Sequence, residues 1–393
     1  MTIKRRLDEI AELQVGFAFK SAGFSGGDQD VRLLRGDNIG QGVLRWENAV
    51  RWSADDAVDE RYAMQAGDLV IAMDRPWIGA GLKFASVTER DLPAWLVQRV
   101  ARLRAKPGVD QRYLHYLFAS RDFTSHILAV QTGTAIPHVS GPQILSFQCP
   151  DHSLLEQRAI AEVLGALDDK IAANARLTES IDRLLDARFE GATRGAPQGM
   201  LEEIAEVNGI TVTPGQGQIR YIDIASVGVG SYEYPALTDW SSAPGRARRK
   251  VSEGDTVWST VRPNRRSHAL VLDAGRNIVA STGLAVITPR EEDFAFVYES
   301  TRTSQFTTFL ESIAEGSAYP AVKAPRFAEA PVPLPSVEQR RAFEALAAPL
   351  RRRGHAAAME SRSLARTRDE LLPLLMSGKV RVKDAEKIVE GSL

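Results

Sequence analysis

The chain has 393 residues, of which 44% are hydrophobic and 25% are charged, close to the averages for soluble globular domains. At roughly 150 residues per domain, this length predicts two or three domains. The 49 lysines and arginines are balanced by 50 aspartates and glutamates. This balance excludes whole-chain polyelectrolyte attraction, so any contact with nucleic acid needs locally segregated basic faces.

Cysteine content and hydropathy narrow the class further. Cys149 is the only cysteine, which excludes intrachain disulfides and cysteine-based zinc fingers. No run of 18 apolar residues occurs, and the start MTIKRRLDEI lacks the apolar core of a signal peptide. We therefore expect a soluble cytoplasmic protein that does not contact a membrane.

The first 190 residues change character at about residue 150. Residues 1–150 carry short apolar runs separated by turn residues, as in GDLVIAM, which predicts strands and turns with an occasional helix such as 110–120. Residues 151–190 contain no proline, and Ser153 and Glu156 open them with a capping-box pattern. The heptad-like stripe that follows predicts a helix of about 37 residues. Its positions are Ile160, Leu164, Leu167, Ile171, Ile181 and Leu185, with Asn174 and Thr178 in the intervening seam.

The second half repeats this plan. Residues 191–200, GATRGAPQGM, have the composition of a linker, and we expect a second strand-rich domain over 201–335. Residues 336–378 predict a second long helix, capped by Ser336, kinked near Pro349 and carrying Arg351–Arg353 on its solvated face. Its predicted stripe is Phe343, Leu346, Leu350, Ala357, Leu364, Leu371 and Leu374. Residues 379–393 form a C-terminal tail.

The two halves are copies of one domain-sized unit. LDEIAE at 7–12 returns as LEEIAE at 201–206, 194 positions later, and Glu-Gln-Arg at 156–158 returns at 338–340, 182 positions later. Matches between these two points have intermediate offsets that fall in order, as expected after a duplication with small deletions. We therefore predict an α+β protein with two globular domains of mixed strands and helices, separated by two long antiparallel coiled-coil-like helices, as a pseudo-twofold internal repeat.

Motifs for catalysis and metal binding are missing. The sequence has no phosphate-binding loop, no dinucleotide-binding glycine motif and no amino-methyltransferase motif. Its six histidines form no closely spaced pair, which argues against a metal site. We therefore expect a non-catalytic chain with no metal and no cofactor of its own.

Basic, amide and aromatic residues cluster in probable loops of both copies. Arginine and asparagine fit guanine and adenine edges in the major groove, whereas lysine and threonine suit phosphates. The candidate DNA-binding residues of copy one are Arg32, Arg35, Asn38, Arg75, Trp77, Lys83, Thr134 and His138. Those of copy two are Arg248, Arg249, Lys250, Arg262, Asn264, Arg265, Arg266, Tyr319 and Lys323.

Structural interpretations of these residues stay open. The basic run at 246–250 is also typical of a solvated loop. Arg75-Pro76 and Arg262-Pro263 occupy equivalent positions, and their arginines could instead pair with a carboxylate such as Asp68 or Asp255. The RGDNI run at 35–39 is also typical of a turn whose polar side chains bond their own backbone.

The whole chain resembles the DNA-specificity subunits of type I restriction–modification systems. The resemblance rests on PDHSLLEQRAIAEVLGALDDKIAANARL at 150–177, its echo LPSVEQRRAFEALAAPL at 334–350, and LLPLLMSGKVRV at 371–382. The LDEIAE and LEEIAE starts and the paired Gly-Asp and Arg-Pro blocks add to it. The second copy departs from the pattern where Pro349 and Arg351–Gly354 replace the Asp-x-Lys-Ile-x-x-Asn element.

The resemblance implies a function and an assembly. It implies a non-catalytic subunit that reads a bipartite, asymmetric target in double-stranded DNA. It also implies two methyltransferase subunits beside the helices and separate restriction and translocase subunits, so that S-adenosylmethionine, ATP and Mg belong to partners. The alternative is a structural adaptor that holds two proteins apart without reading DNA; a methyltransferase fused to its own reader is disfavoured by the missing motifs.

Overall fold

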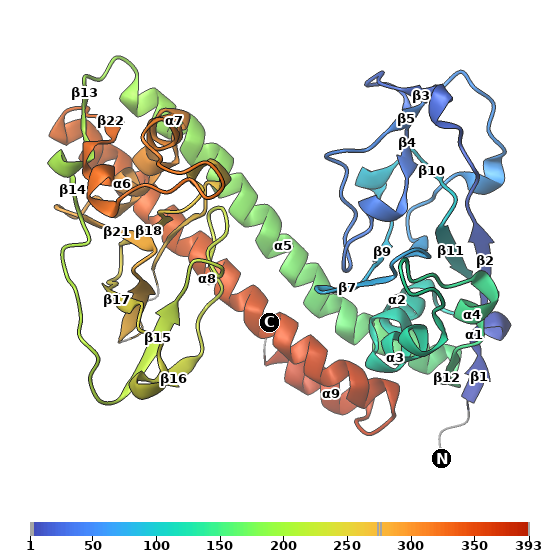
Figure 1. The fold of residues 1–393 in the computed structure, drawn as a ribbon. Coiled ribbons are helices and arrows are strands. Elements are labelled where there is room, and N and C mark those ends of the chain that lie inside the picture. Colours follow the sequence, from blue (N-terminus) through green and yellow to red (C-terminus); the bar gives the residue numbers. More distant parts are fainter. Residues whose placement is uncertain (1–3, 273–274, 276, 392–393) are drawn as a thin grey trace. The chain divides into compact units, whose positions relative to one another are not determined.

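The computed structural model describes residues 4–272, 275 and 277–391, which form two compact units (Figure 1). Unit 1 comprises Met1–Ala172 and Ser361–Leu393, and unit 2 comprises Ala173–Glu360. Each unit contains its own sheets and part of each of two 40-residue helices, α5 (Leu154–Thr193) and α8 (Val337–Met376).

Unit 1 is built from two four-stranded sheets flanked by helices. The first sheet is antiparallel, in the order β2 (Ala11–Val15), β11 (Val100–Ala105), β6 (Leu69–Ala72) and β9 (Phe84–Ser86). The second has the order β10 (Ala94–Leu96), β4 (Val31–Leu34), β5 (Arg51–Trp52) and β3 (Phe24–Ser25). Two short pairs are β1 (Lys4–Arg6) with β12 (Gln148–Pro150) and β7 (Trp77–Ile78) with β8 (Gly81–Leu82). The smaller helices are α1 (Leu7–Ile10), α2 (Gln111–Ala119), α3 (Arg121–Val130), α4 (Gly141–Leu145) and α9 (Val382–Glu390).

Unit 2 has the same kinds of element. Its antiparallel sheet has the order β14 (Ala205–Val207), β21 (Leu284–Pro289), β18 (Thr256–Ser259) and β19 (His268–Leu270). The second sheet has the order β16 (Leu237–Asp239), β15 (Gln218–Ile222), β20 (Ile278–Ser281) and β17 (Ala247–Lys250). A short pair joins β13 (Gln198–Met200) to β22 (Pro331–Pro333), and the smaller helices are α6 (Phe294–Arg302) and α7 (Ser304–Ser312).

The first sheets of the two units agree in strand order and register. Glu12 of β2 lies opposite Arg104, and Glu206 of β14 lies opposite Thr288; these two glutamates are equivalent in the LDEIAE and LEEIAE repeats. The second sheets each contain one parallel pair, β4 with β10 and β15 with β20, but their other strands pair differently. The α+β class expected from the sequence is confirmed.

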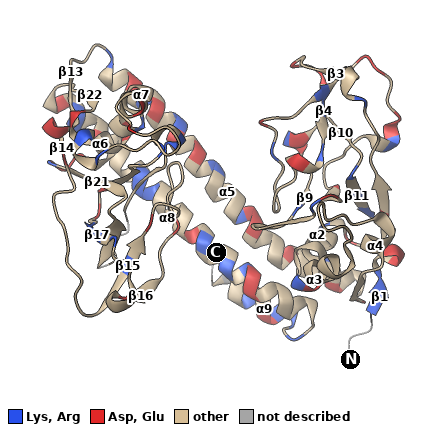
Figure 2. Cartoon of the chain, in the orientation of Figure 1, with Lys and Arg blue, Asp and Glu red and all other residues tan. Residues whose placement is uncertain are grey.

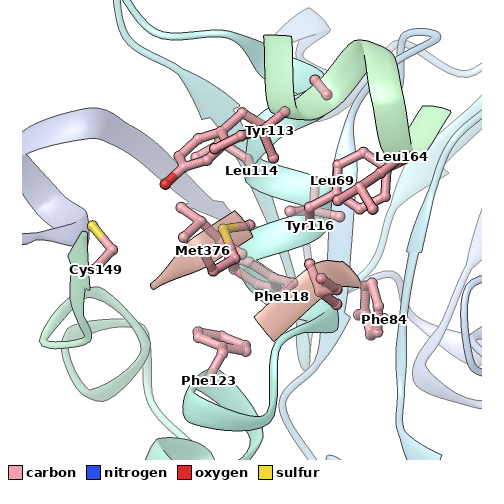
Figure 3. Close-up of a cluster of buried hydrophobic side chains, with 14 of the residues drawn as sticks. Leu69, Phe84, Tyr113, Leu114, Tyr116, Phe118, Phe123, Cys149, Leu164 and Met376 are labelled. Atoms are coloured by element: carbon pink, nitrogen blue, oxygen red, sulfur yellow. The ribbon is translucent and has the colours of Figure 1, made fainter. Parts of the chain in front are cut away.

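The predicted helix stripe supplies much of the core of unit 1. The Ser153–Glu156 capping box forms, with the Ser153 amide donating to the Glu156 carboxylate at 2.9 Å. Leu164 and Leu167 are fully buried in a cluster that also contains Leu364 and Leu371 of α8. Figure 3 shows Leu164 with aromatic residues of α2 and with Met376. Burying each such side chain contributes roughly 1.5–3 kcal/mol.

The opposite ends of the helices meet in unit 2. Ile181, Leu185 and Phe189 of α5 share a buried cluster with Phe343 and Ala347 of α8. The start of α5 packs with the end of α8 in unit 1, and the end of α5 packs with the start of α8 in unit 2. The two helices are therefore antiparallel, as predicted.

The polar seam positions make specific contacts within unit 2. Asn174 is buried and its Nδ2 donates to the Glu360 carboxylate at 2.8 Å. Thr178 Oγ1 donates to the Asn174 carbonyl at 3.0 Å. A buried amide that finds its partner at only one helix register favours that register over its neighbours.

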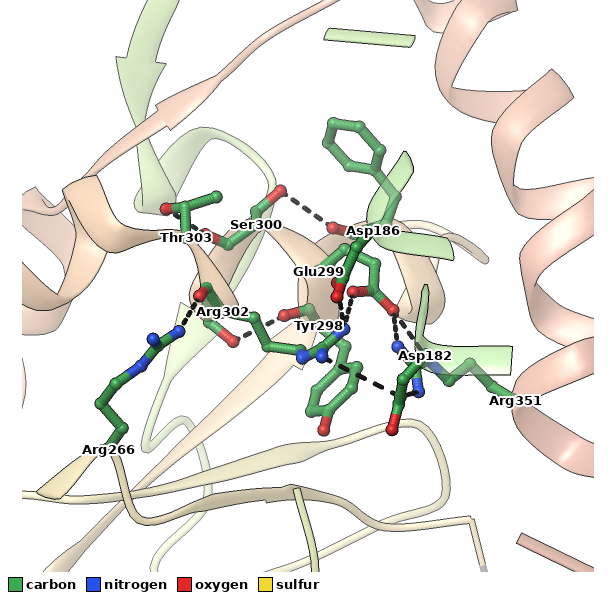
Figure 4. Close-up of polar contacts among 11 residues, drawn as sticks. Asp182, Asp186, Arg266, Tyr298, Glu299, Ser300, Arg302, Thr303 and Arg351 are labelled. Carbon is green, nitrogen blue, oxygen red and sulfur yellow. Dashed lines mark hydrogen bonds and ion pairs between the residues drawn. The ribbon is translucent and has the colours of Figure 1, made fainter. Parts of the chain in front are cut away.

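The structure corrects the sequence interpretation of α8. Leu346, predicted to lie on the stripe, is exposed. The helix runs without a break through Pro349 and Gly354, and the kink near Pro349 stays a prediction. Arg351 does not lie on a solvated face: its guanidinium pairs with Glu299 and Asp182, and its side chain is only 9% exposed (Figure 4). The face that packs inward is the one with Phe343 and Ala347, and a step of four residues from Ala347 leads to Arg351.

The segments assigned as linker and tail contain regular structure. Residues 191–193 complete α5, and residues 198–200 form β13. The tail contains α9, whose Ala385 and Val389 are buried in the core of unit 1. Within the described residues, none of the helices combines the length and the apolar character that crossing a membrane requires.

Candidate nucleic-acid interface

An equivalent pair of loops is joined by the same hydrogen bond in each unit. In unit 1 the Arg75 amide donates to the Pro137 carbonyl at 2.7 Å. In unit 2 the Arg262 amide donates to the Pro320 carbonyl at 2.7 Å. The carboxylate that was the structural alternative for Arg75 is occupied elsewhere, because Asp68 pairs with Arg104. The Arg-Pro blocks are thus held by their backbone.

Arginines in these regions adopt an unusual backbone conformation. Arg75 has φ 45° and Arg99 φ 68° in unit 1, and Arg262 has φ 53° and Arg266 φ 52° in unit 2. Left-handed backbone costs an L-residue roughly 1–2 kcal/mol, and asparagine or aspartate tolerates it better than arginine does. Strain of this kind persists where the surrounding structure fixes it and is concentrated at functional sites.

Unit 1 gathers several predicted residues around one cleft of about 550 Å³. Arg35, Arg75 and Lys83 line it together with Arg99. Lys83 is largely buried, and that burial lowers the pKa of its ammonium group. Asp37 and Asp74 also line the cleft, so its four basic side chains outnumber two carboxylates.

A carboxylate at the cleft orders two of its neighbours. Asp74 Oδ1 lies 2.6 Å from Nδ1 of His138 and 3.5 Å from Nη1 of Arg99. Arg99 Nη1 also lies 3.4 Å from the same histidine nitrogen. These contacts limit the directions in which His138 and Arg99 can point.

The other predicted residues of unit 1 lie outside this cleft's lining. Arg32 donates to the carbonyls of Arg90 and Leu92 and stacks 4.7 Å over the Trp46 ring. Asn38 is buried, and its Oδ1 accepts from the Arg35 amide of its own turn, which matches the alternative interpretation of the RGDNI run. Its Nδ2 donates to the Arg45 carbonyl. Two further predicted residues are exposed. Trp77 lies in the β7–β8 hairpin, and Thr134 lies in the loop that follows α3.

Unit 2 presents its Arg-Pro loop differently. The Arg262 guanidinium lies 4.4 Å from the centre of the Tyr319 ring, and that ring is 69% exposed. Asn264 and Arg265 are exposed in the short helix Pro263–Arg265. Arg266 is turned inward, because its guanidinium donates to the Arg302 carbonyl.

The remaining basic residues of unit 2 divide into two groups. Arg248 and Arg249 are half-buried on β17, and Arg249 donates to the Thr211 hydroxyl at 3.0 Å. Lys250 and Lys323 are exposed, and Lys323 pairs with Glu315 at 3.5 Å. Arg249 and Arg266 are thus engaged inside the unit, whereas the exposed lysines remain open to solvent.

Arg99 was missed by the sequence interpretation. It belongs to no basic run, and its left-handed backbone gives no compositional signal. Figure 2 shows acidic and basic residues interspersed along α5. The cluster of basic residues at the unit 1 cleft is therefore a local feature. Within the described part of the chain, no group of three or more histidine, cysteine, aspartate or glutamate side chains could hold a metal ion.

Comparison with solved structures defines the class of the fold. The chain superposes on the S subunit of a type-I restriction-modification system from M. genitalium with a TM-score of 0.60 and 16% sequence identity, over 96% of each chain. The fold is therefore that of a restriction–modification S subunit.

Sequence comparison identifies the particular relatives. The chain is 32% identical over 181 residues to the type I restriction enzyme MjaVIII specificity subunit of Methanocaldococcus jannaschii, covering 45% of this chain and 42% of that one. It is 32% identical over 167 residues to the EcoAI specificity subunit of Escherichia coli, covering 42% of this chain and 28% of that one. The matched segments thus span less than half of these relatives, and no family model matches the chain. In sequence and in fold, the chain is thus similar to type I specificity subunits.

Proposed function

We propose that this chain is the non-catalytic DNA-specificity subunit of a type I restriction–modification complex and reads a bipartite, asymmetric target. The observation that carries the proposal is the repeated arginine loop, fixed in both units by the same 2.7 Å hydrogen bond to a proline carbonyl. Two equivalent but chemically different loops suit two different half-sites. Arginine is the side chain that reads guanine edges in the major groove by paired hydrogen bonds.

The arrangement within each unit divides the two tasks of DNA binding. Arg75 and Arg99 in unit 1, and Arg262 in unit 2, are the proposed base-reading residues, because their backbone is fixed. The exposed lysines, Lys250 and Lys323, are proposed phosphate contacts. Arg32 and Asn38 support the loops without touching DNA, because their polar groups are already bonded within unit 1.

The partners follow from the resemblance to specificity subunits. We propose that two methyltransferase subunits bind beside the long helices and that restriction and translocase subunits join them for cleavage. S-adenosylmethionine, ATP and Mg would be held by those partners. The absence of methyltransferase and ATPase motifs from the sequence supports this division of labour.

We further propose that the duplication is expressed as a pseudo-twofold repeat of two target-recognition domains separated by α5 and α8. The shared strand order of the first sheets and the equivalent positions of Glu12 and Glu206 support this arrangement. The domain limits proposed from the sequence are 1–150 and 201–335 for the two recognition domains and 151–190 and 336–378 for the two helices, with a linker at 191–200 and a tail at 379–393.

Reconstitution tests the proposal. The chain is combined with a methyltransferase partner, and methylated positions are mapped on genomic DNA. We expect one bipartite motif, steep salt dependence of binding, and a change in only one half of the motif when residues 15–145 are exchanged for those of a relative. Methylation by the lone chain would overturn the non-catalytic assignment, and assembly without sequence preference would favour the adaptor.

A further inference from the structure

A cavity of about 1120 Å³ lies within unit 2, between the first sheet, the start of α6 and α8. Its walls include the turn before β18, the segment between β21 and α6, and residues 337–352 of α8. None of the residues proposed above to contact DNA lines this cavity. It is a separate feature of the unit.

The equivalent position in unit 1 contains a buried ion pair. Asp68, only 3% exposed, directly precedes β6 and pairs with Arg104 of β11. One carboxylate oxygen, Oδ2, accepts from the Gln65 amide at 2.8 Å. The guanidinium of Arg104 approaches as a fork, with Nε 2.5 Å from Oδ1 and Nη2 2.9 Å from Oδ2. This aspartate is fully neutralised within its own unit.

Unit 2 keeps the aspartate and loses the arginine. Asp255, 2% exposed, is the counterpart of Asp68, and its Oδ2 accepts from the Ser252 amide at 2.7 Å. The register of β14 with β21 places Thr288 where unit 1 has Arg104. The Thr288 hydroxyl lies close enough to this carboxylate to lower its pKa. Among the described residues, however, Oδ1 of Asp255 has no partner in good hydrogen-bonding geometry. Burial raises the pKa of Asp255.

A second carboxylate at the cavity is also incompletely bonded. Asp293, 4% exposed, pairs through Oδ2 with Arg340 at 2.7 Å, and its Oδ1 has no hydrogen-bond partner among the described residues. Six carboxylates line the cavity against three arginines. Arg340 is already paired with Asp293, and Arg352 with Glu253 at 3.6 Å. The cavity is therefore lined by more acidic than basic side chains and contains two buried carboxylate oxygens without donors.

The missing group has the chemistry of a guanidinium. A buried carboxylate oxygen without a donor is costly, and the same carboxylate in unit 1 is satisfied by an arginine fork. Within the described residues these side chains do not form a set that could ligate a metal ion. We propose that the cavity of unit 2 binds a guanidinium group, supplied by an arginine side chain of a partner protein that packs along α8.

Thr288 and Asp255 give a direct test on the purified full-length chain. The melting temperature is measured with increasing ethylguanidinium chloride, and with ethylammonium chloride at equal ionic strength. We expect a saturable rise with ethylguanidinium only, as for any ligand that binds the folded state alone. Asp255→Asn should abolish this rise. Thr288→Arg should raise the melting temperature without added salt and remove the response, whereas Thr288→Val, the matched control, should keep it.

Each other result contradicts the proposal. A response that is absent, equal with ethylammonium, or unchanged in Thr288→Arg would show that the cavity is not a guanidinium site. Because this test needs no partner and no DNA, it fails or succeeds independently of the proposed function.

The source of the guanidinium is tested in the assembled complex, and this part rests on the proposed function. Thr288→Arg should weaken association with the methyltransferase partner by about tenfold or more, equal to about 1.4 kcal/mol, while Thr288→Val should not. Association unchanged in Thr288→Arg would overturn the assignment to a partner side chain even if free ethylguanidinium binds.

Discussion

Replacing Arg262 by glycine and by alanine separates a base-reading role from a structural one. Both substitutions remove the guanidinium and its contact with the exposed Tyr319 ring. They differ only in what they do to the backbone, which has φ 53° at this position. Glycine adopts that conformation freely, whereas alanine keeps the strain.

The magnitudes follow from these terms. Relief of left-handed strain raises the free energy of unfolding of the glycine variant by roughly 1–2 kcal/mol. The greater freedom of glycine in the unfolded chain lowers it by about 0.4–1 kcal/mol. Loss of the exposed cation–π contact costs both variants about 0.5–1 kcal/mol. We therefore expect Arg262→Gly to match the parent in stability or nearly so, and Arg262→Ala to be less stable by about 0.5–1 kcal/mol, a shift of a few degrees in melting temperature.

DNA reading should not follow this stability order. Both variants should lose roughly 1–3 kcal/mol of binding to the parent target and relax one position of one half-site. Competition binding with single-base variants of the target measures this loss, and thermal denaturation measures stability in the same samples. If Arg262→Gly reads DNA like the parent chain while Arg262→Ala does not, then Arg262 serves the fold and the base-reading assignment is wrong.

Three further predictions concern stability. Arg351→Ala should lower the free energy of unfolding in urea by roughly 1.5–3 kcal/mol, the worth of a hydrogen bond to a charged group, because Glu299 is buried; the exposed neighbour variant Arg353→Ala should change little, and equal effects would contradict the network. Burial raises the pKa of Glu344 to about 7 from an ordinary 4.5. Because the folded state binds this proton more tightly than the unfolded state does, the free energy of unfolding should fall as the pH rises from 4.5 to about 7. Glu344→Gln should flatten that slope, and an unchanged slope would show that Glu344 does not have a raised pKa. Arg104→Thr should destabilise unit 1 by no more than roughly 3–5 kcal/mol, because the arginine is one-third exposed. Added ethylguanidinium should restore part of the lost melting temperature. A variant as stable as the parent would show that the Asp68–Arg104 ion pair contributes nothing to stability.

Much of the architecture was predictable because it depends on local periodicity and on the duplication. The heptad-like stripe of 151–190 fixed which face of α5 is buried, and Ile160, Leu164 and Leu185 lie there as predicted. The helix at 110–120 begins after Asp110, whose carboxylate accepts from the Tyr113 amide. Signals of this kind are carried by neighbouring residues, so one sequence is enough to read them.

Contacts between distant segments were not predictable in the same way. Arg351 was assigned to solvent because three consecutive arginines are usually exposed, yet the helix turns it onto the face that meets Glu299. The unpaired state of Asp255 depends on which residue of β21 lies beside it. Only the strand register reveals that this residue is Thr288. Arg99 reaches its place through a backbone conformation that its neighbours in the sequence do not encode.

The division of the chain has a consequence for its synthesis. Unit 2 is one continuous stretch, Ala173–Glu360, whereas unit 1 joins residues from both ends of the chain. On the ribosome, the second unit can therefore complete its core before the first, although it is made later. Until Leu364, Leu371 and Leu375 emerge, the cluster around Leu164 and Leu167 lacks the part that α8 contributes. Unit 1 thus completes its core only after the end of α8 and α9 have been synthesised.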